Sequence, residues 1–285
     1  MAKFERPLVM GHKGMLGSQL YLILRKLYPA TVGLDIEELD ITDQKQVEDA
    51  FSHLKPDVII NCAAYTRVDA CESNRELAFR VNGDGSRYLA QAAARLNARL
   101  VHLSTDYIFD GKKRSPYIEE DQPHPISVYG ESKLRGDEAV RETLDDYLIV
   151  RTSWLFGVKG PNFVYAILSQ AREGKTLRVV NDQVGSPTYA VDLSRTIIKL
   201  LELNYQGIIN FSNYGSCSWF DFARAILRLK GMSQVEVQPI TSQQLNCPAR
   251  RPHFSVLSLS KIKSVLGAYP RPWEAALAEL LSIAD

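Results

Sequence analysis

The chain of 285 residues is 45% hydrophobic and 24% charged, a composition typical of a globular protein that buries a sizeable core. Its 34 lysines and arginines nearly cancel its 33 aspartates and glutamates, so its charge does not favour nucleic acid or an anionic membrane as a partner. No apolar run approaches the roughly 18 residues that a membrane-spanning helix needs. The length predicts one large domain or two modest ones.

The cysteines and histidines indicate neither a disulfide framework nor a metal site. The four cysteines form no CxxC pair, which predicts free thiols in a reducing compartment. The five histidines show no HExxH or other metal-ligand spacing. Residues 1–7 lack the apolar core of a signal peptide. We therefore expect a cytoplasmic protein without a bound metal.

An expected strand over residues 7–10 runs into a glycine-rich turn and then into a helical pattern over residues 18–25. Gly11, Gly14 and Gly17 stand three residues apart in this turn. Such glycines let the backbone approach a pyrophosphate, which the N-terminus of the helix stabilises. A plain tight turn is the alternative, but the strand before and the helix after favour a dinucleotide site.

A second expected strand, residues 30–34, ends at Asp35. An acidic residue roughly 20 residues after the glycine motif accepts hydrogen bonds from the adenosine ribose. Asp35 favours NADH, because it would repel the 2′-phosphate of NADPH. Lys13, inside the glycine loop, would instead neutralise that phosphate, and no arginine follows Asp35. We therefore expect that both NADH and NADPH are used.

The alternation of helices and strands continues through residues 44–54 (helix), 57–61 (strand), 76–96 (long helix) and 99–103 (strand). Ala63 and Ala64 follow the third strand and leave room for a cofactor, although a tightly packed turn explains them nearly as well. The fourth strand ends at Ser104 and Thr105. Ligands bind outside the carboxyl ends of the strands in open α/β sheets, so these residues are predicted to meet the glycine loop at one edge.

A helix expected from residue 128 to about 143 carries Tyr129 and Lys133, which lie on one face because they are four residues apart. A phenol titrates near pKa ~10, and a neighbouring ammonium lowers that pKa toward neutrality, where acid–base catalysis is efficient. This spacing is common, and a packed tyrosine beside a solvated lysine is the alternative. The predicted closeness of Ser104 and Thr105 favours a proton-donating site.

The alternation loosens in the second half of the chain. Expected elements there are strands over 147–151, 207–211 and 235–238, helices over 192–202 and 219–229, and two final helices. We predict an α/β fold with a Rossmann-type doubly wound parallel sheet and a smaller C-terminal α/β substrate-binding subdomain. The Rossmann core would comprise residues 1–155 and about 186–216. The interwoven subdomain would comprise about 156–185 and 217–285.

Eight motifs occur in sequence order and together carry a family resemblance. They are GxxGxxG, DxTD, NxAAYTxVD, STDYxFDG, YGxSK, RTSWLFG, NDQxGSPT and RRPxxSxL. This set resembles the extended short-chain dehydrogenase/reductase superfamily and is most similar to the dTDP-4-dehydrorhamnose reductase family. The matching motifs run from about residue 8 to 260, nearly the whole chain.

The resemblance implies hydride transfer from NADPH or NADH to C4 of dTDP-4-dehydro-β-L-rhamnose, giving dTDP-L-rhamnose for cell-surface polysaccharide. It implies that Tyr129 protonates the C4 alkoxide, that Lys133 holds the nicotinamide ribose and that Thr105 donates a hydrogen bond to the same oxygen. Asp106 and Trp154 would shape the sugar pocket. The cofactor site would be lined by Gly11, Gly14, Met15, Leu16, Gly17, Asp35, Asp40, Ile41, Ala63, Ala64, Tyr65, Tyr129 and Lys133.

Several residues keep two interpretations. Trp154 either contacts the sugar or packs in the core. Arg250 and Arg251 are either solvated charges or a bidentate grip on a diphosphate. Asn82 matches the structural asparagine of the superfamily or is a helix-surface amide. The polar loop at residues 181–188 either contacts substrate or forms turns only.

Three functions stay open. The first is the reductase. The second is another nucleotide-sugar 4-ketoreductase, epimerase or dehydratase, for which Asp106 beside Thr105 is the relevant feature. The third is a non-catalytic regulatory subunit similar to the methionine adenosyltransferase β subunit, which an intact set of Thr105, Tyr129 and Lys133 disfavours. A nucleotide sugar is the expected partner, and a homodimer is possible.

Overall fold

The computed structural model describes residues 4–283, so part of the N-terminal stretch considered for a signal peptide lies outside the described residues. Its centre is a six-stranded sheet in the order β10-β5-β4-β3-β1-β2, and every neighbouring pair is parallel. The strands are β1 (Pro7–Met10), β2 (Val32–Leu34), β3 (Val58–Asn61), β4 (Arg99–Thr105), β5 (Tyr147–Thr152) and β10 (Gly207–Asn210).

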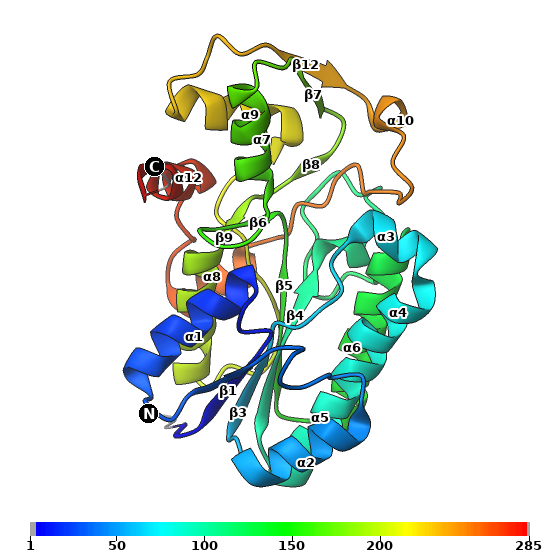
Figure 1. Cartoon of the computed structure of the whole chain (residues 1–285), viewed down its shortest axis with the longest axis vertical. Helices are drawn as coiled ribbons and strands as arrows, with labels where there is room; N and C mark the ends of the chain where they lie inside the picture. The colour runs from blue at the N-terminus through cyan, green and yellow to red at the C-terminus, as the bar shows by residue number, and fades with distance from the viewer. Residues whose placement is uncertain (1–3, 284–285) are drawn as a thin grey trace.

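Helices cover both faces of this sheet (Figure 1). On one face lie α1 (Met15–Leu27) and α8 (Ala190–Glu202), and on the other α2 (Gln44–Leu54), α5 (Ser86–Leu96) and α6 (Val128–Thr143). Consecutive residues of β1 point to opposite faces: Val9 packs with α1 and α8, whereas Leu8 and Met10 pack with α2 and α5. Burial on both faces explains why the strands are continuous apolar runs. The predicted doubly wound parallel sheet is confirmed.

The chain order of the strands reverses between β1 and β3, which lie side by side while β2 lies on the other side of β1. The connections after β1 and β3 run in opposite directions across the sheet. They diverge at this point and leave a crevice at the carboxyl ends of the two strands. The glycine loop follows β1 and Ala63 follows β3, so both lie at this crevice. The fold thus positions a ligand site before any side-chain chemistry is considered.

The long helix predicted over residues 76–96 is interrupted in the structure. It consists of α4 (Arg75–Phe79), a π-helical segment η1 (Arg80–Gly85) and α5. Asn82 lies in η1 and is 1% exposed. Its carboxamide accepts the N–H of Tyr65 at 2.8 Å and donates to the Tyr65 carbonyl at 3.1 Å and to Ser132 Oγ at 2.9 Å. Asn82 is therefore a structural bridge and not a helix-surface amide.

A second, smaller core lies beyond the carboxyl edge of the sheet, in the upper part of Figure 1. It packs α7 (Phe163–Arg172), α9 (Trp219–Leu229) and α12 (Trp273–Ile283) against the parallel pair β7 (Leu177–Val180) and β12 (Val237–Ile240). The sequence patterns predicted neither α7 nor β7, and β12 begins two residues later than expected. The exact division of the chain into core and subdomain stays a prediction.

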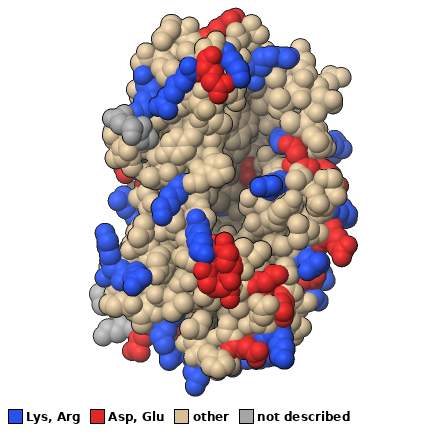
Figure 2. All heavy atoms as spheres, in the orientation of Figure 1, with Lys and Arg blue, Asp and Glu red and all other residues tan. Residues whose placement is uncertain are grey.

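Short elements complete the chain. They are α3 (Val68–Ser73), η2 (Asp106–Ile108), β6 (Leu155–Phe156), β8 (Val184–Gly185), β9 (Thr188–Tyr189), β11 (Cys217–Ser218), α10 (Ser242–Leu245) and α11 (Ser260–Leu266). The viewed surface carries both signs of charge and is hollowed between the lower and upper parts (Figure 2). Within residues 4–283, none of the helices combines the length and apolarity needed to cross a bilayer.

Candidate active site

The glycine loop is packed so closely that side chains would not fit. A Cβ on Gly11, whose φ is +71°, would lie 2.8 Å from the backbone nitrogen of Ala63. A Cβ on Gly17 would lie 2.1 Å from the Gly11 carbonyl oxygen. Gly14 is the N-cap of α1 and supplies no side-chain cap, and the first turn of α1 has no acidic residue. The exposed N–H groups and the positive end of the helix dipole are therefore available to an anion.

Asp35 lies beside this loop at the end of β2. Its carboxylate accepts the N–H of Lys13 and the N–H of Ile36, each at 2.9 Å. Each oxygen retains a lone pair for a ribose hydroxyl. Together with the glycine cradle and the uncapped helix, this geometry fits an adenine dinucleotide.

The other expected cofactor residues lie on the adjoining loops. Asp40 accepts the N–H of Thr42 at 2.9 Å, and the buried Ile41 packs against Gly85 of η1. Ala63 donates its N–H to Asn61 Oδ1 at 3.1 Å, and Tyr65 is held by Asn82 as described above. These contacts fix the backbone that follows β3.

Tyr129 and Lys133 lie in the first two turns of α6, which begins at the N-cap Ser127, whose hydroxyl accepts the N–H of Gly130. A Cβ on Gly130 would lie 2.2 Å from the Tyr107 carbonyl oxygen, so glycine lets α6 approach η2 directly after β4. The Tyr107 ring packs edge-on against the Tyr129 ring, with centroids 5.6 Å apart. This approach brings the α6 residues to Thr105 at the end of β4.

Burial raises the pKa of Tyr129 above its ordinary value, and the hydrogen bond with Thr105 opposes that rise. The Lys133 ammonium donates to the Leu103 carbonyl at 2.6 Å and is 3% exposed. Burial lowers the pKa of Lys133 to about 8, against the opposing charge of Asp137. Burial dominates the pKa of Tyr129 in this structure and Lys133 is bonded to a carbonyl, so the lowering of the Tyr129 pKa by Lys133 stays a prediction.

A buried polar network that the sequence patterns did not predict lies behind Lys133. Asp137 accepts from Ser104 Oγ at 2.7 Å and lies 3.4 Å from His102 Nε2, and His102 Nδ1 lies 3.2 Å from Asn61 Nδ2. Burial acts to raise the pKa of Asp137, but the nearby His102 and the hydrogen bond from Ser104 hold it below its ordinary value. Burial and the charge of Lys133 lower the His102 pKa, which keeps the imidazole neutral. The signal for Asp137 was its position one helical turn after Lys133.

Asp106, next to Thr105, is 2% exposed and accepts from the Thr105 hydroxyl at 3.1 Å. Burial raises its pKa to about 7, and hydrogen bonds from Ser255 and Thr105 oppose that rise. Its Oδ2 is buried without a hydrogen-bond partner in the described part of the chain. A buried polar oxygen of this kind is suited to a ligand hydroxyl.

Arg251 donates two hydrogen bonds to the Asp69 carboxylate, at 3.0 and 2.7 Å, in a bidentate pair. Arg250 is exposed. The sequence left Arg250 and Arg251 as either solvated charges or a grip on a diphosphate. In this structure the Arg251 guanidinium does neither, because it is paired with Asp69 of α3. The pair ties the segment before α11 to the Rossmann sheet.

Trp154 joins the two parts of the molecule. Its backbone has a φ of +45°, rare for a bulky residue, and its indole stacks on Trp219 with centroids 3.6 Å apart and planes 8° apart. A Cβ on Gly185 would lie 2.5 Å from the indole, so only glycine permits this placement. Trp154 is partly buried, which fits both core packing and contact with a sugar.

The polar loop at residues 181–188 is engaged with the protein itself. Asp182 accepts the N–H and the hydroxyl of Ser242, and Gln183 donates to the same hydroxyl at 2.9 Å. Thr188 accepts from Thr152 at 3.2 Å. The loop therefore fixes α10 and the end of β5. These contacts are all within the protein, as expected if the loop has a structural role.

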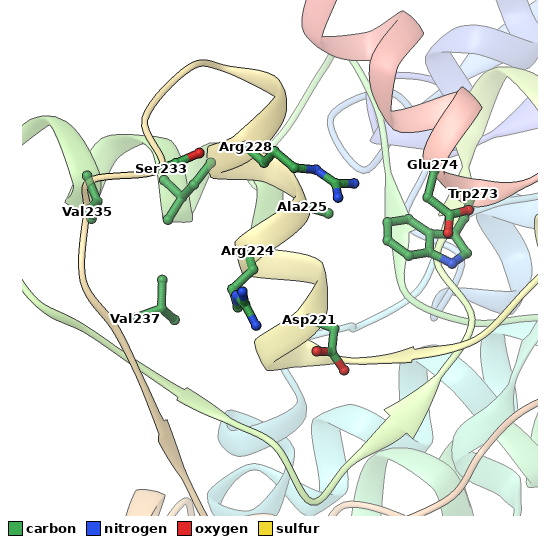
Figure 3. Close-up of a pocket in the computed structure, with 10 residues that line it drawn as sticks. Asp221, Arg224, Ala225, Arg228, Ser233, Val235, Val237, Trp273 and Glu274 are labelled. Atoms are coloured by element: carbon green, nitrogen blue, oxygen red, sulfur yellow. The ribbon is translucent and has the colours of Figure 1, made fainter.

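A cavity of about 450 Å³ lies elsewhere, between α9, β12 and α12 (Figure 3). Its lining includes Arg224, Arg228 and Trp273, and none of the predicted site residues. No cluster of three or more histidine, cysteine, aspartate or glutamate side chains suited to a metal occurs within residues 4–283. The predicted site residues lie instead at the carboxyl edge of the sheet.

Comparison with known proteins places this geometry in a family. The family model described as the RmlD substrate binding domain matches residues 5–285. The chain is 42% identical to the dTDP-4-dehydrorhamnose reductase of Streptomyces griseus, over 98% of this chain and 94% of that one. It is 41% identical to the spore coat polysaccharide biosynthesis protein SpsK of Bacillus subtilis (strain 168), over 97% and 96%.

Solved structures agree in fold. A dTDP-4-dehydrorhamnose reductase from Bacillus anthracis str. Ames in complex with NADP is 39% identical and covers 98% of this chain and 99% of that one, with a TM-score of 0.94. A Thermus thermophilus UDP-glucose 4-epimerase in complex with NAD, at 21% identity, has a TM-score of 0.85 and shows a shared fold alone. The family resemblance carried by the motifs is thereby confirmed: the chain belongs to the RmlD substrate binding domain family, on a short-chain dehydrogenase/reductase fold.

Proposed function

We propose that this protein is an NAD(P)H-dependent dTDP-4-dehydrorhamnose reductase that reduces the C4 ketone of dTDP-4-dehydro-β-L-rhamnose to dTDP-L-rhamnose. One observation carries the proposal: Thr105, Tyr129 and Lys133 converge at the end of β4, beside an uncapped helix and a glycine cradle suited to a dinucleotide. Full-length relatives with this named activity support the sugar assignment.

The reduced nicotinamide, when bound, supplies the hydride that forms the new C4–H bond. The protein supplies the proton: Tyr129 Oη donates it to the oxygen of the former ketone. Because burial raises the Tyr129 pKa, the phenol is protonated at neutral pH and ready to donate. Thr105 donates a hydrogen bond to the same oxygen and stabilises the charge that develops there.

Below its pKa of about 8, Lys133 carries a positive charge on the same face of α6 as Tyr129. It also holds the nicotinamide ribose by hydrogen bonding. Asp106 and Trp154 contact the sugar, since both lie at the junction of the two parts and Asp106 has a buried oxygen without a protein partner. The Rossmann core (1–155 and about 186–216) binds cofactor, and the remaining residues form the substrate subdomain.

The nucleotide sugar is the one partner that the proposal requires, and a homodimer stays a prediction. The four cysteines are free thiols, which suits a reducing cytoplasm.

A second candidate is another nucleotide-sugar 4-ketoreductase. The chain is also 39% identical to a protein of Streptomyces niveus named dTDP-4-keto-6-deoxy-D-glucose reductase, over 96% of both chains. The reacting ketone and the proton donor would be the same, so the difference lies in the sugar. The intact catalytic set argues against a purely regulatory subunit.

The test is a turnover assay with each sugar in turn. Purified protein is incubated with dTDP-4-dehydro-β-L-rhamnose or with dTDP-4-keto-6-deoxy-D-glucose, and with NADH or NADPH. Loss of reduced-nicotinamide absorbance is followed and the sugar product is identified. We expect dTDP-L-rhamnose from the first sugar. No oxidation of either cofactor with either sugar would remove the proposal.

Tyr129→Phe provides the mechanistic test. Loss of a positioned general acid costs on the order of 10²–10⁴-fold in rate, so kcat should fall by that factor. Cofactor binding should persist, because the glycine loop and Asp35 are unchanged. Tyr147→Phe, which removes a hydroxyl at the amino end of β5, away from the carboxyl edge, should keep the parent rate. A Tyr129→Phe protein with undiminished kcat would show that the proton comes from elsewhere.

A further inference from the structure

The turn after β2 places two glutamates over Lys13 of the glycine loop. Lys13 Nζ donates to Glu37 Oε2 at 2.9 Å and to Glu38 Oε1 at 2.7 Å. The other oxygen of Glu38 accepts the N–H of Asp35 at 2.9 Å, and Asp35 accepts the N–H of Lys13 at 2.9 Å. One connected cluster therefore joins the ribose-facing acid, the two glutamates and the lysine.

This cluster lies where the two nicotinamide cofactors differ. A free ribose 2′-hydroxyl can donate to the Asp35 carboxylate, whose orientation is fixed by two backbone N–H groups. A 2′-phosphate brings about −1.5 to −2 charges to the same place. An arginine near the acid accommodates that phosphate in NADP-binding folds, but the next residue here is Ile36, which is 67% exposed.

Lys13 is the cation whose own backbone contacts Asp35, and its ammonium is already engaged. The hydrogen bonds that Lys13 donates to Glu38 and Glu37 raise the Lys13 pKa and lower the pKa of both glutamates. All three groups are therefore charged at neutral pH. A phosphate arriving here meets three carboxylates and a single ammonium that two of them hold.

We propose that Glu37 and Glu38 hold Lys13 away from the 2′-phosphate position and thereby make NADH the preferred cofactor over NADPH. The inference rests on the proposed function only in that the ligand is a reduced dinucleotide. Glu37 and Glu38 act as specificity-determining residues and take no part in the chemistry. Because the three side chains are 42–64% exposed, the preference should weaken as salt is added.

The experiment measures direct binding of NADH and NADPH by titrating nicotinamide fluorescence without any sugar. Its result is therefore independent of which nucleotide sugar is reduced. The unaltered protein should bind NADH about fivefold to tenfold more tightly than NADPH at low salt. In the double variant Glu37→Gln/Glu38→Gln, the affinity for NADPH should rise by about tenfold while that for NADH changes by less than about twofold.

Two further variants separate the release of Lys13 from a general change in charge. Glu173→Gln/Glu202→Gln removes the same two charges from exposed lysine ion pairs remote from the glycine loop, and should leave the NADPH-to-NADH ratio unchanged. Lys13→Met should cost NADPH binding little in the unaltered protein. In the Glu37→Gln/Glu38→Gln background it should abolish the gain, as expected of coupled residues.

Equal or tighter binding of NADPH by the unaltered protein would overturn the proposal. So would an unchanged ratio in Glu37→Gln/Glu38→Gln, or an equal change in the remote control. Tight NADH binding together with inactivity on both sugars would leave the cofactor inference supported and remove only the proposed reductase function.

Discussion

At the scale of single residues, the site depends on charges that are buried together. Lys133 is nearly inaccessible; desolvation lowers its pKa to about 8, and the charge of Asp137, also buried, opposes that fall. Asp137 in turn is held ionised by His102 and Ser104. The catalytic face of α6 is thus supported by an anion one helical turn deeper, which the side-chain spacing of Tyr129 and Lys133 does not reveal.

Asp137→Asn tests this support. Activity that requires protonated Lys133 should fall as the pH rises through about 8. Without the Asp137 anion the Lys133 pKa drops further, so the alkaline limb of kcat/KM should move to lower pH, on the order of one pH unit. Circular dichroism checks folding, and Asp84→Asn, which removes an exposed carboxylate, is the control. An alkaline limb that stays in place would show that Asp137 acts on structure alone.

At the scale of elements, the sequence predicts what periodicity and local chemistry encode. The strands β1, β3, β4 and β5 and the glycine turn follow from apolar runs and glycine spacing, and α6 starts at the expected residue. The break in the long helix does not, because it is imposed by a tertiary contact. Asn82 must face Tyr65 and Ser132, and Gly136 lets α6 approach the Asn82 carbonyl, where a Cβ would lie 2.3 Å away.

The elements α7 and β7 were missed for a related reason. Their apolar residues pack into the second core with α9 and α12, which are distant in the chain, and the surrounding residues are polar turns. Asp137 and His102 were missed because each resembles an ordinary helix or strand residue until the sheet brings them together. The expected roles of the site residues and the domain boundaries remain predictions.

Asn82→Ala tests the structural role of Asn82 in η1. The substitution strands the N–H and carbonyl of Tyr65, and a buried unsatisfied polar group costs about 1–3 kcal/mol. The free energy of unfolding should fall by at least about 2 kcal/mol, seen as a lower urea midpoint with an unchanged slope. Asn74→Ala, which removes an exposed amide bonded within its own helix turn, should change the midpoint far less. Equal effects of the two would mean that the bridge does not stabilise η1.

At the scale of the whole molecule, two cores meet at the carboxyl edge of the sheet, and several side chains link them. Trp154 does so by stacking on Trp219, and Arg251 does so through its bidentate pair with Asp69. Burial raises the pKa of Tyr107 and the nearby charge of Arg251 opposes that rise, and the Tyr107 ring packs against Tyr129. The Arg251 guanidinium therefore lies between the C-terminal segment and Tyr129, the proposed proton donor.

Arg251→Ala should consequently affect sugar binding more than stability. The Asp69 side chain is 40% exposed, so solvent screens the pair and the loss of unfolding free energy should be no more than about 1 kcal/mol. The KM for the nucleotide sugar should rise by about fivefold to tenfold, because a shift of the segment before α11 misplaces Tyr107 and Tyr129, and geometric misplacement is costly at a reacting centre. The Kd for NADH should not change, since the glycine loop and Asp35 lie outside this contact.

Arg251→Lys distinguishes the bidentate fork from the charge. A lysine keeps the charge but cannot present two parallel N–H donors, so the KM should lie between those of the parent and of Arg251→Ala. Arg250→Ala, which truncates the exposed neighbour, is the control and should leave the KM unchanged. A rise in the NADH Kd equal to the rise in the sugar KM would point to general loosening of the sheet edge. An unchanged KM in Arg251→Ala would show that other contacts, such as the Trp154 stack and the Arg271–Asp192 pair, hold the alignment of the two cores.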